Sequence, residues 1–203
     1  MRIILVRHGQ SEDNITRTIA GHRPTPLSSL GEVQAQILGK KFLELNLQFE
    51  AVYSSDLKRA VQTTEIICDE LGISDIIYDR RLREGEAGNF TGKRFDELTD
   101  EEQATFHDLI VDLDSKAHDG ESTNEQMERT REAFLEIVNN HPEDSTILLV
   151  GHGGTLYHIL RNTLDILPER EEWFGNCKLN VIERQSPESD WRLTILDNIQ
   201  LDV

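Results

Sequence analysis

Two histidines follow apolar runs that are typical of buried strands. Residues 3–6 (IILV) lead directly into Arg7 and His8, and residues 147–150 (ILLV) lead through one glycine into His152. Burying such groups is costly without partners, so they could simply mark the surface ends of two strands. Alternatively, because the carboxyl ends of parallel strands share one edge of a sheet, both histidines would meet at a ligand site. The glycine after each histidine would let a ligand approach the backbone.

Two further charged groups are expected at the same edge. The run FEAVYSSDLKRA predicts a strand followed by a helix with Arg59 in its first turn, and the shorter strand DIIYD leads to a loop that carries Glu84. Arg7 and Arg59 offer guanidiniums that bind phosphate oxygens in bidentate fashion. The imidazoles supply a nucleophile and a donor, and the carboxyl supplies a proton. This inventory predicts phosphoryl transfer without a metal ion or other cofactor.

The nucleophile and the acid have opposite electrostatic needs. A histidine nucleophile requires a free lone pair, yet ordinary imidazole has a pKa of about 6.5. Arg7 and Arg59 should lower the pKa of His8 by like-charge repulsion and keep it neutral near pH 7. The carboxyl of Glu84 must instead hold a proton beside the phosphate in order to act as a general acid.

Composition limits the possible partners. The 203 residues, of which 37% are hydrophobic and 29% charged, predict one soluble domain with a real core. A formal net charge of −17 disfavours nucleic acid and anionic membranes, which require a basic face. Cys68 and Cys177 form no zinc-type spacing, and neither a signal peptide nor a membrane-spanning stretch is recognisable. We therefore expect a buried reduced thiol at Cys68, a cytoplasmic location and a small phosphorylated metabolite met by local cations.

Apolar periodicity predicts strands that alternate with helices. Strands are expected over residues 2–6, 49–55, 75–79 and 145–151, and the segments KLNVIERQ and DWRLTILDN predict a closing antiparallel hairpin. The first long helix should bury Leu30, Val33, Ile37, Leu38, Phe42 and Leu45, and a later one should begin with a capping box of Ser122 and Glu125. The fold class is α/β: a three-layer α/β/α sandwich around a mostly parallel mixed sheet, with a small helical cap. We expect one domain over 1–203, with the cap inserted at 93–120.

The ordered motifs resemble those of the histidine phosphatase superfamily, the fold shared with cofactor-dependent phosphoglycerate mutase. RHGQSEDN at 7–14 resembles the signature RHG(E/Q)(T/S)xxN, and SSDLKRAVQTTEI at 54–66 resembles SSDLxRAxQT(A)E. GHRPTPLSSLGEVQA, LREGEAGNFTG, GES and VGHGG follow the family order, between residues 21 and 154. Two positions depart from the pattern: Pro24 replaces a common aspartate, and Thr91 replaces the usual glutamate.

The resemblance implies roles for the matched residues. His8 would be the nucleophile that forms a phosphohistidine, and Glu84 would protonate the leaving group and then activate water. Arg7, Arg59 and His152 would bind the phosphoryl oxygens, together with Asn14. The remaining candidates do not match catalytic positions and are expected to be structural or on the surface: His22, His107, His118, His141 and His158. Trp173 and Phe174 are expected in the core rather than at the rim of the site. Arg80, Arg81 and Arg83 are expected to offset the acidic run from Asp96 to Glu121 rather than to touch substrate.

Three functions compete: a phosphatase, a phosphoglycerate mutase and a catalytically silent phosphate-binding module. All five core positions hold competent residues, which disfavours the silent module. Mutases of this family hold the substrate through a tyrosine where this chain has Ala87, a lysine where it has Phe95, and a pair of arginines in the cap. Between Phe95 and Glu121 the chain has no arginine and only Lys116 as lysine. The mutases also have Gly-Asn directly after the second histidine, whereas this chain has Gly153 and Gly154. Without these anchors we expect release of product and attack by water.

Overall fold

A six-stranded mixed sheet forms the centre of the protein. The computed structural model describes residues 1–166 and 175–194, so Trp173 and Phe174 lie outside the described residues. The strands stand in the order β3-β2-β4-β1-β5-β6. Their bounds are β1 (Arg2–Arg7), β2 (Ala51–Ser54), β3 (Ile77–Tyr78), β4 (Thr146–Gly151), β5 (Leu179–Glu183) and β6 (Arg192–Thr194). Strands β1 to β4 pair in parallel, and β5 and β6 pair antiparallel, which confirms the mixed sheet and its closing hairpin.

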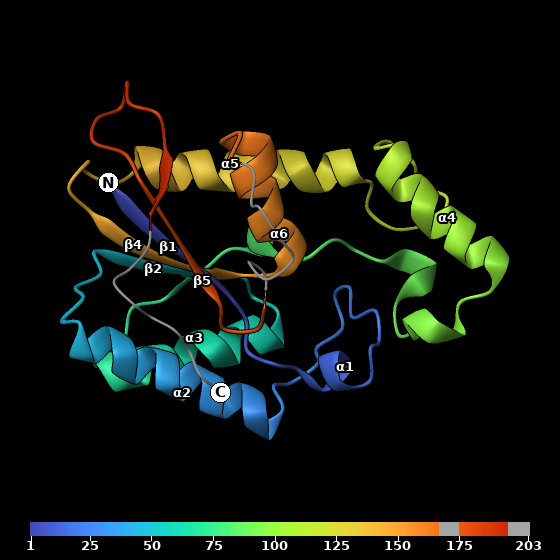
Figure 1. Ribbon diagram of the computed structural model, residues 1–203, viewed down its shortest axis with the longest axis horizontal. Coiled ribbons are helices and arrows are strands. Elements are labelled where there is room, and N and C mark those ends of the chain that lie inside the picture. Colours follow the sequence, from blue (N-terminus) through green and yellow to red (C-terminus); the bar gives the residue numbers. More distant parts are fainter. Residues whose placement is uncertain (167–174, 195–203) are drawn as a thin grey trace.

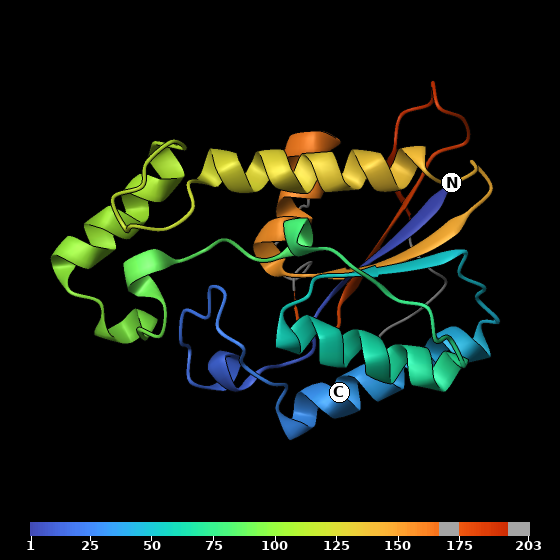
Figure 2. The same cartoon turned by 180° about the vertical axis from the view of Figure 1, so that it is seen from behind.

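Helices cover both faces of the sheet (Figure 1). One layer holds α2 (Ser29–Glu44) and α3 (Lys58–Leu71), and the other holds α5 (Thr123–Asn139) and α6 (Gly153–Tyr157). Seen from behind, the same layers enclose the sheet (Figure 2). The remaining elements are α1 (Glu12–Ile15), α4 (Asp100–Val111), the 3₁₀ turns η1 (Arg80–Leu82), η2 (Gly88–Phe90) and η3 (Phe95–Glu97), and the π-helical turn η4 (His158–Thr163). The expected three-layer α/β/α sandwich is confirmed.

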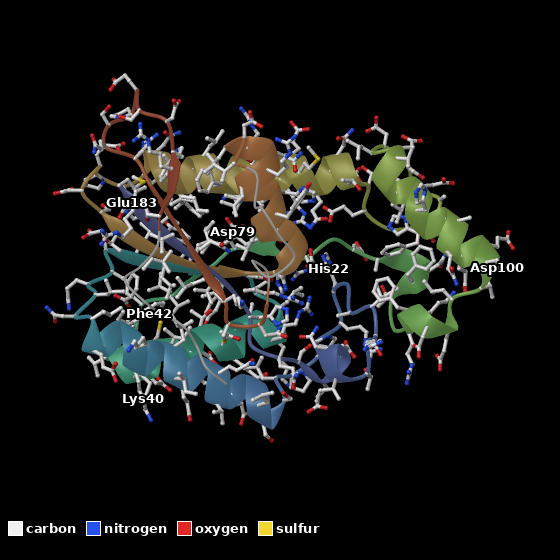
Figure 3. All side chains as sticks on the ribbon, viewed as in Figure 1. His22, Lys40, Phe42, Asp79, Asp100 and Glu183 are labelled. Carbon is white, nitrogen blue, oxygen red and sulfur yellow. The ribbon has the colours of Figure 1, made fainter. Side chains whose placement is uncertain are left out.

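The two-residue period of β1 divides the core between the layers. Ile3 and Leu5 pack with residues of α5 and α6, whereas Ile4 and Val6 pack with residues of α2 and α3. Successive strand side chains point to opposite faces, so a continuous apolar run is what a sheet covered on both sides requires. Phe42 illustrates the second layer, because it lies between α2 and the sheet (Figure 3).

Helix α2 exposes two residues that its apolar spacing assigned to the core. Leu30 is 42% and Val33 is 45% exposed, so that part of the expected face is wrong. The buried face consists of Gly31, Ala35, Leu38, Gly39 and Phe42. Small residues on this face let the helix come close to its neighbours; a Cβ at Gly31 would overlap the carbonyl of Gln10. Close backbone approach therefore decides the orientation of α2, not the largest apolar stripe.

The segment between β3 and α5 lies to one side of the sandwich. Helix α4 projects there in both views (Figures 1 and 2), and Asp100 marks its first residue (Figure 3). Ile19, Phe90 and Leu98 form a small apolar cluster under this segment, separate from the two main clusters. The expected cap at 93–120 therefore contains η3 and α4. Among the helices of the described residues, none is long and apolar enough to cross a membrane.

Candidate active site

Parallel pairing of β1 with β4 brings the two histidines together. Arg7 and Gly151 are register partners at the carboxyl ends of these strands, and the next residues are His8 and His152. The backbone N–H of His8 donates to the carbonyl of Gly151 across 3.0 Å. The two imidazole rings lie with centroids 5.1 Å apart and tilted by 57°. Both side chains are buried, so this edge of the sheet holds a paired-histidine centre.

Hydrogen bonds fix the proton of His8 on one nitrogen. Its Nδ1 lies 2.7 Å from the carbonyl oxygen of Gly9, which can only accept. The guanidinium of Arg59, which can only donate, places Nε 3.3 Å from Nε2 of His8. The proton therefore sits on Nδ1, and Nε2 keeps a lone pair. Burial lowers the pKa of His8 well below its ordinary value, and the charges of Arg59 and Arg7 lower it further. The expected direction holds, with burial as the larger cause.

Two guanidiniums act on His8: that of Arg59 lies beside this lone pair, and the charge of Arg7 also lowers the pKa of His8. Arg59 lies in the first turn of α3 and is 2% exposed; it donates to the carbonyls of Gly21 at 3.0 Å and Arg23 at 3.3 Å. Arg7 ends β1 near the start of α6, where a Cβ added at Gly153 would be 3.8 Å from its Nε. Burial lowers the pKa of both arginines, and the charge of Glu84 partly offsets this effect. Such buried cations provide a cradle for an anion.

Glu84 is held at the same edge by three N–H donors. The backbone N–H of Gly154 donates to Oε2 at 3.1 Å, and that of Gly85 donates to Oε1 at 3.2 Å. The side-chain amide of Gln126 also donates to Oε1, at 3.0 Å. A Cβ at Gly154 would overlap this carboxylate, so glycine is required where α6 begins. The structure thus brings all five expected residues to one edge of the sheet: Arg7, His8, Arg59, Glu84 and His152.

Asn14 is linked to the histidine pair through one intervening residue, Asn176. Its Oδ1 accepts from the backbone N–H of Ser11, in the capping box of α1, and from Asn176 Nδ2 at 3.1 Å. Asn176 Nδ2 also lies 3.0 Å from the carbonyl oxygen of His8. Asn14 is therefore coupled to the backbone of His8 through Asn176.

Several residues of the site were assigned no role from the sequence. Ser55, Gln126, Arg129 and Asn176 come from four different segments and meet the expected residues only in the fold, although Ser55 lies in the SSDL motif. Arg129 of α5 donates to the carbonyls of Arg81, Arg83 and Glu84 and is held by both oxygens of Glu121. It thereby ties the loop of Glu84 to α5. Only the GES motif, which contains Glu121, hinted at this arrangement.

The other expected structural residues fall into place around this centre. His22 lies at the carboxyl end of the sheet and its Nε2 is 2.7 Å from the carbonyl oxygen of Glu84 (Figure 3). Arg81 pairs with Asp79 and Glu136, and Arg83 pairs with Asp56, so their carboxylate partners lie outside the acidic run of residues 96–121. Cys68 is buried and unbridged, as expected, and Cys177 is buried and unbridged as well. Within the described residues, no three His, Cys, Asp or Glu side chains gather as metal ligands.

The fold and the site define the class: an α/β protein that presents two histidines and two arginines to an anion at the carboxyl edge of its sheet. The chain belongs to the histidine phosphatase superfamily (branch 1), whose family model matches residues 3–197. This finding confirms the family that the motifs indicated.

Some proteins similar to this chain are named as mutases and others as phosphatases. The probable phosphoglycerate mutase GpmB of Enterobacter sp. (strain 638) is 36% identical over 194 residues, 94% of this chain and 87% of the relative. A mycobacterial glucosyl-3-phosphoglycerate phosphatase has a TM-score of 0.79 at 28% identity, covering 96% of this chain and 97% of that one. YhfR of Bacillus stearothermophilus gives 0.81 at 27%, covering 98% of each chain.

Proposed function

We propose that this protein is a metal-independent phosphatase that hydrolyses small phosphate monoesters through a phosphohistidine on His8. The observation that carries the proposal is the state of His8. Its Nε2 keeps a lone pair, its lowered pKa keeps the ring neutral, and Arg59 already donates to that atom. A phosphoryl group placed there would meet a nucleophile and buried cations at once.

The reaction can be written with these residues alone. Nε2 of His8 attacks phosphorus, and the bond from phosphorus to the ester oxygen breaks. The carboxyl proton of Glu84 goes to the leaving oxygen, so an alcohol departs. Glu84 then takes a proton from a water molecule whose oxygen attacks the phosphohistidine, and the N–P bond breaks. Inorganic phosphate leaves, with His8 neutral and Glu84 protonated again.

The charges of the expected cap favour hydrolysis over isomerisation. A mutase must retain an anionic product while it reorients, which requires cations facing the site. In the described part of the cap, Lys93 pairs with Glu102, Arg94 with Asp96, and Lys116 with Glu125. The structure places Ala87 beside the small apolar cluster of Phe90. These pairings leave hydrolysis as the better supported outcome.

A mutase activity is the second candidate, because curated relatives at 34–36% identity are named probable phosphoglycerate mutases. The mycobacterial phosphatase is also known with inorganic phosphate bound, at 28% identity. Both names point to small phosphorylated carboxylic or sugar acids as the substrate class. The acidic cap disfavours substrates with a second phosphate.

Hydrolysis of p-nitrophenyl phosphate by wild type and His8→Ala tests the proposal. We expect wild-type turnover, loss of at least 99% of it in the folded variant, and an acid-labile, base-stable phosphoryl group on wild type after rapid quench. Retained hydrolysis in the variant would refute the nucleophile. Binding of phosphate without turnover would favour the silent module. Loss of activity on EDTA dialysis, restored by Mg²⁺ or Zn²⁺, would refute the metal-independent mechanism.

A further inference from the structure

His152 has two ring nitrogens in different surroundings. The side chain is fully buried, and its Nε2 lies 2.8 Å from Oγ of Ser55. Its Nδ1 is also buried but makes no hydrogen bond within the part of the chain that the structure describes. Leaving such a group without a partner is costly, and native proteins retain few of them. Each one calls for a ligand or a functional reason.

The hydroxyl of Ser55 has one acceptor for its proton among the described contacts, Nε2 of His152. Ser55 is fully buried, and its Oγ already accepts the backbone N–H of Leu57 at 3.3 Å. A buried hydroxyl still has one proton to donate, and Nε2 of His152 is the acceptor in contact with it. Ser55 therefore donates, and Nε2 of His152 accepts with its lone pair.

The ring of His152 carries a single proton. Burial lowers its pKa well below the ordinary value, and the charges of Arg59, His8 and Arg7 lower it further. A neutral imidazole has one N–H, and Nε2 is occupied as an acceptor. The proton must then be on Nδ1, the nitrogen without a partner. The ring that carries this N–H lies 5.1 Å from the ring of His8 and close enough to Arg59 and Arg7 for their charges to lower its pKa.

We propose that Ser55 is a positioning residue that holds His152 in its Nδ1–H tautomer, so that Nδ1–H is the donor to a phosphoryl oxygen. The identity of the ligand rests on the proposed function; the tautomer rests on contacts within the chain. Ser55 then acts through His152 and touches no reacting atom. Without its hydroxyl, neither nitrogen is fixed, and the proton distributes over both.

Nitrogen-15 NMR of the imidazole side chains tests the tautomer in wild type. The His152→Gln variant identifies the resonances of His152. We expect the proton on Nδ1 at neutral pH and a shift of that signal on addition of inorganic phosphate. A proton found on Nε2 in the free protein would overturn the inference. This measurement keeps serine at position 55, so it does not depend on whether a Ser55 variant folds.

Ser55→Ala tests the role of the hydroxyl, with Ser54→Ala as the matched control. Ser54 is the adjacent buried serine, and its hydroxyl donates instead to the carbonyl of Ser55. Ser55→Ala should give a mixed tautomer and weaken phosphate binding about tenfold, as expected for one hydrogen bond to a charged ligand. Ser54→Ala should keep the wild-type tautomer and affinity. An unchanged tautomer in Ser55→Ala would overturn the role of Ser55. Ser55→Cys, close in size and a weak donor, answers the same question if the alanine variant does not fold.

These results separate the inference from the proposed function. Wild type that binds phosphate with His152 in the Nδ1–H form but hydrolyses no monoester would refute only the phosphatase. Hydrolysis by an enzyme whose His152 carries the proton on Nε2 would refute only the role of Ser55.

Discussion

Glu84 and Glu86 stand two residues apart, but their surroundings differ. Glu84 receives N–H groups from Gly85, Gln126 and Gly154 at the edge of the sheet. The side chain of Glu86 is exposed. A general acid near the phosphate must be positioned, and only Glu84 is held in this way.

Replacing each glutamate by glutamine should therefore separate them. A general acid matters most when the leaving group is poor, because a good one departs without a proton. We expect Glu84→Gln to slow hydrolysis of an alkyl phosphate by about 10²–10⁴-fold. Hydrolysis of p-nitrophenyl phosphate should fall much less, and Glu86→Gln should change either rate only modestly. The reverse pattern in steady-state kinetics would assign the proton to Glu86.

The buried histidines also connect the site to stability. The pKa values of His8 and His152 lie well below 6.5 in the folded protein, mainly because of burial. The unfolded chain therefore binds more protons than the folded one below pH 6.5. Folding is favoured above that pH and loses free energy as the pH falls toward the folded pKa values. Burying these two neutral histidines therefore costs the least folding free energy when the pH is neutral or higher.

Denaturant unfolding at pH 7.5, 6.5 and 5.5 measures this linkage. Each histidine should contribute a loss of up to about 1.4 kcal/mol per pH unit below 6.5. We expect the pH dependence of His8→Asn to be shallower than that of wild type by this amount. His107 is exposed on α4, so His107→Asn should leave the wild-type slope. Equal slopes in wild type and His8→Asn would contradict a buried neutral His8.

At the scale of elements, helix α2 supports the backbone that carries His8. Gly31, in its first turns, packs so closely on Gln10 that a Cβ would overlap the carbonyl oxygen and approach the backbone nitrogen to 2.9 Å. Gln10 follows His8 by two residues. The same carbonyl accepts the N–H of Ser28, the N-cap of α2. A shift of α2 would therefore move the nucleophile.

Gly31→Ala should lower both stability and catalysis. Overpacking costs about 1–3 kcal/mol, and a displaced nucleophile should reduce kcat/KM by about 10–100-fold. Gly72→Ala is the matched control: its φ of +67° is unfavourable for alanine, but no atom of the described residues lies within 4 Å of the added Cβ. It should cost about 1–2 kcal/mol and leave kcat/KM unchanged. Equal kinetic effects in the two variants, measured beside denaturant unfolding, would show that the packing of Gly31 does not position His8.

The sequence predicted the elements better than it predicted their faces. Continuous apolar runs and capping residues identified β1, β4 and α5, because strand burial and helix capping are local properties. The buried face of α2 was wrong, because its orientation depends on close contact of Gly31 with a distant backbone segment. Local periodicity cannot express such a contact.

The same limit applies to the site. Arg7, His8 and His152 follow strands, so parallel pairing predicts their meeting, and Arg59 and Glu84 follow the next ones. The residues that hold them do not repeat any local pattern. Ser55 lies in the SSDL motif, but its role is identified only by its distance to His152, and that of Arg129 only by its contacts with three carbonyls. Those contacts span 45 residues or more in the sequence.

At the scale of the whole molecule, a net charge of −17 surrounds a small cationic centre. Arg59, which is buried, and Arg7, which is half-buried, offset the negative net charge locally. Charges inside a protein are screened far less than those on the surface. Outside the centre, the cap offers an incoming anion little attraction. Its exposed cations are joined to carboxylates, as in the pair of Arg94 with Asp96 at 2.7 Å and that of Lys116 with Glu125 at 2.5 Å.

This distribution predicts how the phosphohistidine divides between two fates, return of the phosphoryl group to the bound acid and transfer of it to water. A mutase returns the phosphoryl group to a bound acid, so it must hold that acid through cations while the phosphohistidine exists. Here the acid would leave and water would attack. With 3-phosphoglycerate as substrate, we expect phosphate to be released at least about tenfold faster than 2-phosphoglycerate appears, a preference worth about 1.4 kcal/mol. Parallel assays of free phosphate and of the isomer measure this ratio, with an authentic mutase as the positive control. Faster formation of the isomer would overturn hydrolysis as the main activity and assign the cap a way to hold the acid.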